Sequence, residues 1–113
     1  MARFETLVIP TDKGPVEVRV YRKQRGLAVT REIGETSGHY ILTHIRSGRR
    51  VAYESWPTLR EAYAALDAVT SDLDWDRPAE EIKNDRRYYD AAHRRLASLS
   101  PYRAPYLKEA DNG

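Results

Sequence analysis

The strongest local signal in the chain lies at residues 57–61, where one sequence pattern gives way to another. Before it, runs of alternating polar and apolar residues are typical of half-buried strands. Pro57 lacks the backbone N–H that a strand ladder needs. Thr58 and Glu61 then match a capping box, in which each side chain accepts a hydrogen bond from the other residue's backbone. The pattern predicts a helix that begins directly after a strand, and therefore a chain that mixes both kinds of element.

The residues after Thr58 have the period of a helix that covers a sheet. On a wheel of about 100° per residue, one stripe of the helix is apolar. Its members are Leu59, Ala62, Tyr63, Leu66, Val69, Thr70 and Leu73. The opposite side carries Arg60, Ala64, Asp67, Ala68 and Ser71. We therefore expect this helix to lie across one face of a sheet.

Four or five strands are expected before the helix. The segment VEVRVYR, residues 16–22, alternates without error, with three valines on one face and Arg19 and Tyr21 on the other. The full set of expected strands is 3–9, 16–22, 26–33, 39–45 and 50–55. The strand at 26–33 alternates less regularly than the others. Turn-forming residues connect the strands, which predicts an antiparallel meander.

A second helix is expected to begin near Pro78, a favoured first-turn residue, and to end at Ser100. Its apolar stripe is Ile82, Tyr89, Ala92, His93, Leu96 and Leu99, interrupted by Asp85, with Lys83, Arg87 and Arg94 opposite. The predicted architecture is one α+β domain over residues 1–100. It consists of a four- or five-stranded antiparallel meander, one helix packed on a sheet face, and a second, C-terminal helix. Residues 101–113 are expected to form a flexible tail.

Composition excludes several classes of protein. The chain has no cysteine, which excludes disulfides and thiolate metal sites. Its first residues do not form a secretory signal, and its apolar runs are too short to span a membrane. We therefore expect a cytoplasmic protein. His39, His44 and His93 do not form a cluster with metal-ligand spacing, so no metal or other cofactor is expected.

The sequence DLDWD, residues 72–76, begins like a calcium-binding loop. Such a loop needs glycine at its sixth position and a bidentate glutamate at its twelfth. Those positions hold Arg77 and Lys83. We therefore expect Asp74 and Asp76 to serve the start of the second helix, with Trp75 packed in the corner between the two helices.

No catalytic motif is present. The sequence has no glycine-rich phosphate loop, no G-x-S-x-G elbow and no paired carboxylates at a catalytic spacing. We therefore expect a binding protein and not an enzyme.

The charges are distributed unevenly. Residues 16–55 hold 8 basic and 4 acidic side chains, residues 56–81 hold 2 and 7, and residues 82–103 hold 6 and 2. A segregated basic face attracts polyanions.

The first hypothesis is therefore a small non-enzymatic protein that binds nucleic acid through a basic sheet face and its hairpin turns. The candidate contacts are Arg19, Tyr21, Arg22, Lys23, Arg25, Arg46, Arg49 and Arg50. Arginines at such positions also keep a protein soluble and protect edge strands, so both interpretations stay open.

A second hypothesis is a protein-binding modulator, such as an inhibitor of a host enzyme encoded by a phage or mobile element. Its contacts would lie in the acidic segment, whose charge imitates that of nucleic acid. They are Asp67, Asp72, Asp74, Trp75 and Asp76. An unpaired edge strand would permit self-association under either hypothesis.

The stretch SGRRVAYESWPTLREAYAAL, residues 47–66, resembles the three-stranded, one-helix DNA-binding domains of tyrosine recombinase N-termini and plant AP2-type factors. In those families a basic hairpin ends in an aromatic residue, and a T-x-x-E-A helix braces the sheet. It also resembles small uncharacterised proteins of phages and mobile elements. The resemblance implies that the sheet enters the major groove of DNA, with contacts from Arg19, Arg46, Arg49 and Arg50. This chain departs from those families in its extra N-terminal strands and its second helix.

Overall fold

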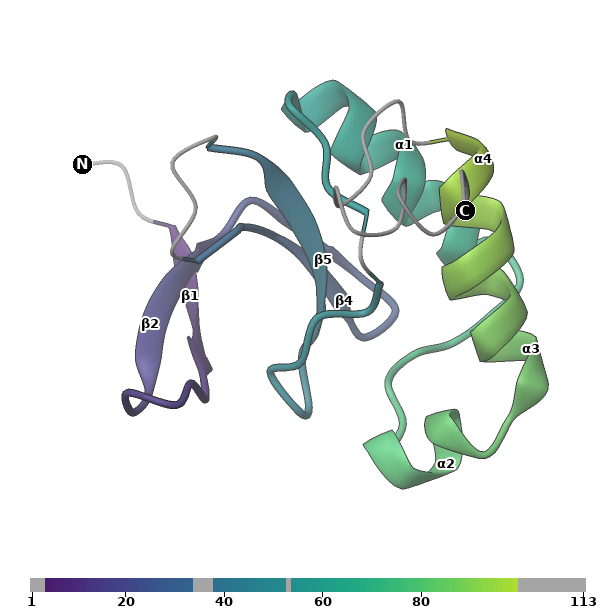
Figure 1. Cartoon of the computed structure of the whole chain (residues 1–113), viewed down its shortest axis with the longest axis horizontal. Helices are drawn as coiled ribbons and strands as arrows, with labels where there is room; N and C mark the ends of the chain where they lie inside the picture. The colour runs from purple at the N-terminus through teal and green to yellow at the C-terminus, as the bar shows by residue number, and fades with distance from the viewer. Residues whose placement is uncertain (1–3, 34–37, 53, 100–113) are drawn as a thin grey trace, which may run out of the picture.

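The computed structural model describes residues 4–33, 38–52 and 54–99 (Figure 1). The strands are β1 (Glu5–Ile9), β2 (Val16–Val20), β3 (Arg22–Gln24), β4 (Leu27–Arg31) and β5 (Tyr40–His44). The helical elements are α1 (Leu59–Thr70), α2 (Ala79–Lys83), α3 (Arg86–Asp90), the π-helical turn η1 (Ala91–Arg95) and α4 (Leu96–Leu99). The predicted α+β class is confirmed. The predicted tail, 101–113, lies outside the described residues.

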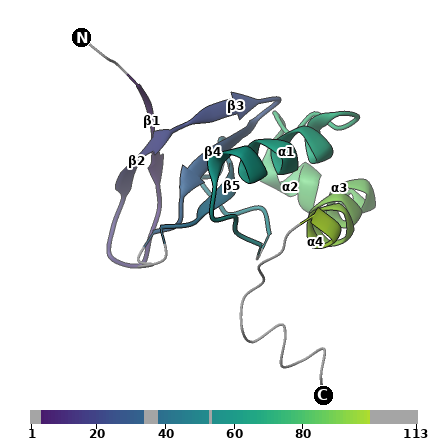
Figure 2. The same ribbon diagram turned by 90° about the horizontal axis from the view of Figure 1, so that it is seen from above.

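The strands form two antiparallel sheets instead of one meander. One sheet has the order β1-β2 and the other β3-β4-β5. β2 and β3 are consecutive in the chain and are separated only by Tyr21, whose backbone N–H donates to the carbonyl of Val29 at 2.9 Å. The chain therefore passes from one sheet to the other at Tyr21, and Figure 2 shows β3 leading away from β2.

The predicted strand at 50–55 is not a regular strand. This segment touches β5 through isolated bridges between Thr43 and Arg50 and between Tyr40 and Trp56. Between the two bridges, the guanidinium of Arg50 binds the carbonyl of Ala52 at 2.6 Å. The carbonyl of Ala52 is thus bonded to a side chain of the same segment, so this carbonyl does not need a partner in a neighbouring strand.

The three-stranded sheet lies between the β1–β2 hairpin and the helices (Figure 1). The side facing the helices carries Leu27, Val29 and Leu42, and the opposite side carries Ala28, Thr30, Ile41 and Thr43, all of them buried. On that second side, the hydroxyls of Thr30 and Thr43 bond each other at 2.9 Å. Burial on both faces explains why the sequence of β4 does not alternate cleanly.

The valine face of β2 packs against the second sheet and not against a helix. α1 contacts β3, β4 and β5, whereas β2 packs on β4. Val16, Val18 and Val20 are half-buried there, while Arg19 on the other side of the strand is exposed. Arg19 therefore faces solvent, as the alternation predicts.

Helix α1 begins where the sequence predicts. The hydroxyl of Thr58 accepts a hydrogen bond from the backbone N–H of Glu61 at 3.2 Å, a cap that typically contributes about 1 kcal/mol. Within the described residues, Oε2 of Glu61 is buried without a hydrogen-bond partner, so the returning half of the capping box is missing. The buried residues are Ala62, Ala65, Leu66, Val69 and Thr70, close to the predicted stripe.

The predicted second helix is interrupted. α2 ends at Lys83, and α3 begins after Asp85, whose carboxylate accepts from the backbone N–H of Arg87 at 3.0 Å. Figure 1 shows α2 set apart from the longer helical segment that starts at α3. Asp85 therefore begins a new helix, whereas the sequence pattern predicts only an interruption in one apolar stripe.

Because the helix restarts and contains a π-helical turn, the predicted apolar stripe is partly wrong. Ala92 and Leu96 are buried as expected, together with Tyr88. Tyr89 is 58% exposed and Leu99 is 47% exposed. The predicted stripe also included His93, which is exposed.

The stability of the protein is expected to fall in acid through Asp85. Hydrogen bonds from the Arg87 side chain, and secondarily from its backbone, lower the pKa of Asp85 to about 2. A carboxyl with a depressed pKa stabilises the fold while it is ionised. Its contribution should be complete above about pH 4 and be lost as the pH falls towards about 2.

Asp85→Asn tests this expectation because asparagine keeps the cap but not the charge. Chemical denaturation from pH 7 to pH 2 should show that wild type loses its advantage over the variant below about pH 4. Parallel pH dependences in the two proteins would show that the ion pair does not stabilise the fold.

Trp75 packs between the helices as predicted. It is 3% exposed, its indole N–H donates to the carbonyl of Val69 at 2.8 Å, and its ring meets that of Tyr88 edge-on at 4.8 Å. The backbone N–H of Trp75 also donates to the carbonyl of Arg25 at 2.7 Å. Residues 72–76, which we call the acidic loop, are thereby docked on the turn between β3 and β4.

The predicted role of Asp74 and Asp76 at the start of the second helix is wrong. The residue that caps α2 is Pro78, with no side-chain hydrogen bond. Asp74 instead accepts from the backbone N–H of Asp76 at 2.9 Å, and Asp76 pairs with Arg46 at 2.9 Å. Docking through Trp75 thus places Asp76 beside Arg46, which follows β5.

Candidate nucleic-acid interface

Four aromatic rings gather where the chain passes between the two sheets. Tyr21 lies at the passage, Tyr40 begins β5, Phe4 precedes β1, and Tyr63 comes from α1. The rings of Tyr21 and Tyr40 meet edge-on, with centroids 5.3 Å apart and planes at 82°. The hydroxyl of Tyr63 donates a long hydrogen bond of 3.5 Å to the carbonyl of Tyr21.

Three arginines lie over these rings. The guanidinium of Arg19 is 4.7 Å from the centroids of both Phe4 and Tyr21. Arg22 lies 4.3 Å from the ring of Tyr63, and Arg31 lies 5.3 Å from that of Tyr40. A chain of this length is expected to contain about one or two significant cation–π pairs. We name the seven residues the arginine–aromatic ladder: Phe4, Arg19, Tyr21, Arg22, Arg31, Tyr40 and Tyr63.

The arginines of the ladder are exposed cations. In the described part of the chain, Arg19, Arg22 and Arg31 have no acidic group within 4.0 Å. A hydrogen bond to the hydroxyl of Tyr40 raises the pKa of Arg31 above its ordinary value. Glu17 lies on the same face of β2 as Arg19 and is the nearest acidic side chain along that strand. The surface is therefore basic and aromatic together.

The structure brings together three of the eight predicted nucleic-acid contacts. Arg19, Tyr21 and Arg22 belong to the ladder. Lys23 lies beside it in β3 and is paired with Glu5 at 2.8 Å. Four members of the ladder were not among the predicted contacts: Phe4, Arg31, Tyr40 and Tyr63.

Arg25, Arg46 and Arg49 lie at the opposite end of the three-stranded sheet, whereas the side chain of Arg50 binds Glu32, which directly follows β4. Ile45, just after β5, donates its backbone N–H to the carbonyl of Gly26 at 3.0 Å. The turn after β3, which contains Arg25, and the turn at residues 46–50 therefore share one end of the sheet. The ladder is near the start of β5, so the eight predicted residues do not form one surface.

The Ser-Gly turn at residues 47–48 is a packing contact. Gly48 is buried with φ +71°, and a Cβ there would lie 2.6 Å from Cδ of Pro10. Two of the neighbouring arginines are neutralised, Arg46 by Asp76 and Arg50 by Glu32. The turn is therefore not a free basic finger.

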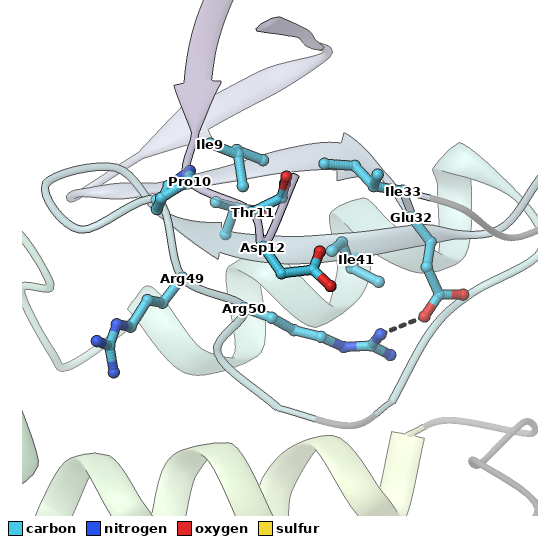
Figure 3. A pocket seen from close by; sticks show the side chains of 11 residues that line it. Ile9, Pro10, Thr11, Asp12, Glu32, Ile33, Ile41, Arg49 and Arg50 are labelled. Carbon is cyan, nitrogen blue, oxygen red and sulfur yellow. Dashed lines mark hydrogen bonds and ion pairs between the residues drawn. The ribbon is translucent and has the colours of Figure 1, made fainter. Parts of the chain in front are cut away.

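A hollow of about 510 Å³ opens beside this turn (Figure 3). Its wall includes Ile9, Ile33 and Ile41, and Figure 3 shows Arg50 extending towards Glu32 along its edge. Arg50 and Glu32 neutralise each other, and the other two charged lining residues, Arg49 and Asp12, have opposite signs. The hollow therefore has no excess of positive charge and does not extend the basic surface of the ladder.

Most acidic residues of the second hypothesis are exposed but bonded to other side chains of the same chain. Asp72 binds Arg95 through two bonds of 2.6 and 2.9 Å, which lower the pKa of Asp72. Asp67 accepts from the amide of Gln24 at 3.2 Å. Trp75, a candidate contact under that hypothesis, is buried and packs against Tyr88.

The histidines have structural partners. The ring of His44 is 5% exposed, with Nδ1 at 2.8 Å from the hydroxyl of Ser47 and Nε2 at 2.9 Å from the carbonyl of Trp75. His39 lies 3.0 Å from the hydroxyl of Ser55. Within the residues that the structure describes, no group of three or more histidine or acidic side chains is placed to hold a metal ion. In the same residues, no helix has the length and apolar character to cross a membrane.

No family model, curated protein or solved structure matches this chain, so its function is inferred from its own residues.

Proposed function

We propose that the protein is a non-enzymatic nucleic-acid-binding module that contacts its ligand through the arginine–aromatic ladder. The observation that supports this proposal is the alternation of three exposed arginines with four rings. None of the three arginines has an acidic partner among the residues that the structure describes. Arginine binds backbone phosphates, and aromatic side chains stack on bases. Groups that can bind phosphates and groups that can stack on bases therefore lie on the same surface.

The chemistry of the ladder favours single-stranded nucleic acid. Aromatic rings can stack only on bases that have left a duplex. Phe4 is 57% exposed at one end of the ladder, so a base can reach its ring. In a duplex the phosphates are accessible but the base faces are not, and the rings would add nothing to binding.

The ring contacts also prepare the arginines for phosphate. A guanidinium that lies over a ring is held in place, while its N–H groups stay available at the edge. Arg19 is held between two rings, so it loses less side-chain entropy on binding than a mobile arginine would. The same number of charges on unsupported side chains should therefore bind more weakly.

The alternative, a protein-binding modulator that uses the acidic segment, has less support. Asp67, Asp72 and Asp76 are bound to side chains of the same chain, and Trp75 is buried. A partner protein would have to break these contacts before it could use the segment.

Replacing Phe4 by alanine should reduce the affinity for a mixed-sequence single-stranded oligonucleotide by about fivefold or more. Loss of one base–aromatic stack typically costs about 1–3 kcal/mol. Fluorescence anisotropy with a labelled oligonucleotide measures the change. Tyr89→Ala is the matched control, because Tyr89 is equally exposed on α3 and lies outside the ladder. Equal losses in the two variants, or no loss in either, would contradict a stacking role for the ladder.

A further inference from the structure

A second, larger hollow lies at the end of the three-stranded sheet opposite to the ladder. It has a volume of about 710 Å³ and separates the turn at residues 47–51 from α2. Figure 1 shows the turn after β5 and α2 at the same side of the molecule. Sites for small ligands commonly have volumes of about 300–1,000 Å³. The hollow is therefore large enough for a small molecule.

Buried hydrogen bonds hold the two walls in place. His44, at the end of β5, bonds through Nε2 to the carbonyls of Trp75 at 2.9 Å and Arg77 at 3.0 Å. Two carbonyl partners require that Nε2 carries the proton. The segment that leads into α2 is thus bonded to the end of β5.

Two cations line the hollow from its two sides. Arg49 comes from the turn and Lys83 from the last turn of α2. Among the described residues, neither has an acidic group within 4.0 Å. The third cation, Arg50, is neutralised by Glu32. Glu80 also lines the hollow, so Arg49, Lys83 and Glu80 together leave one positive charge there.

The rest of the wall is mixed, with His44 and Ser47 as polar members beside several apolar side chains. Pro10, Val51 and Ile82 line the hollow, and the last two are half-buried. A ligand that fits must therefore combine an anionic group with an apolar or aromatic body.

We propose that this hollow binds a small phosphate monoester that carries an aromatic ring system, such as a mononucleotide. Arg49 can donate two parallel hydrogen bonds to a phosphate, and Lys83 supplies a second positive charge from the facing wall. The ring system lies against Val51 and Ile82. The site is separate from the ladder, since the two lie at opposite ends of β5, so neither proposal depends on the other.

The test is a titration of the ¹⁵N-labelled full chain with adenosine 5′-monophosphate, followed by amide chemical shifts. Saturable shifts are expected at Ser47, Arg49, Ile82 and Lys83. Adenosine and inorganic phosphate should each bind at least about tenfold more weakly, because each lacks one half of the interaction.

Variants assign the interaction to residues. Arg49→Gln and Lys83→Gln should each weaken the binding of the monophosphate by about tenfold or more. Glu80→Gln should strengthen it, because an opposing charge is removed. Arg94→Gln, at an exposed arginine outside the hollow, should bind as the wild type does. Amide shifts away from the hollow confirm that each variant is folded.

Three results would overturn the proposal. The first is the absence of shifts at the hollow at millimolar monophosphate, or shifts at the ladder instead. The second is adenosine or inorganic phosphate binding as tightly as the monophosphate. The third is an equal loss in Arg94→Gln and in Arg49→Gln, which would show non-specific attraction. None of these results would contradict the proposed role of the ladder, because its residues are not changed.

Discussion

Replacing Gly26 by alanine is expected to lower the free energy of unfolding by about 2–5 kcal/mol. Gly26 has φ +89°, and a Cβ there would lie 2.3 Å from the backbone nitrogen of Asp76 and 2.4 Å from the carbonyl carbon of Trp75. These are backbone atoms, so no side-chain rotation can relieve the overlap. The acidic loop must move away from the sheet, and the hydrogen bond from Trp75 to Arg25 is lost with it.

Gly14→Ala is the control for this substitution. Gly14 has φ +106°, but a Cβ there would have no atom within 4 Å. Gly14→Ala therefore measures the cost of backbone strain without steric overlap, and we expect this cost to be about 1–2 kcal/mol. Urea denaturation of both variants measures the difference. If the two substitutions cost the same, the acidic loop is not docked on the β3–β4 turn as described.

Replacing Trp75 by alanine should cost about 3–5 kcal/mol, the range for a large buried aromatic side chain. The substitution leaves a cavity beside Tyr88 and an unpaired carbonyl at Val69. Trp56 is 1% exposed and remains as a fluorescent probe of unfolding. Tyr89→Ala, at a position 58% exposed, should change the stability by less than about 0.5 kcal/mol. A cost below about 1 kcal/mol for Trp75→Ala would contradict its place in the core.

The same docking explains why Arg46 is not an unpaired basic residue. Trp75 carries Asp76 to the end of the sheet, where it neutralises Arg46. Charges that are separated along the sequence are thus brought into contact by the fold. Counting charge by segment predicted a basic face there, because a count of this kind contains no information on long-range packing.

Features set by neighbouring residues could be predicted from the sequence. The cap at Thr58, the buried stripe of α1 and the exposure of Arg19 all follow from residues within one or two turns or one strand. The restart of the helix at Asp85 was missed because an aspartate within an apolar stripe was treated as an interruption and not as a cap.

The ladder was only partly predictable. Arg19 and Tyr21 are two residues apart on one strand, so alternation places them together. Arg31 lies opposite Tyr40 only through the register of β4 and β5, and Arg22 meets Tyr63 only through the position of α1 on the sheet. Those contacts depend on tertiary structure. One sequence signal does point to the ladder, because tyrosines stand near arginines at the ends of predicted strands and helices.

The salt dependence of nucleic-acid binding tests the central proposal most directly. Arg19→Gln with Arg31→Gln removes two cations from the ladder, and Arg86→Gln with Arg94→Gln removes two from the C-terminal helices. Anisotropy titrations with a single-stranded oligonucleotide over a range of salt concentrations give the slope of log K against log salt for each protein. The ladder variant should bind more weakly, with a slope reduced by about 1.4, while the control variant keeps the wild-type slope. Identical slopes in the ladder and control variants, or no binding by wild type at low salt, would contradict the proposal.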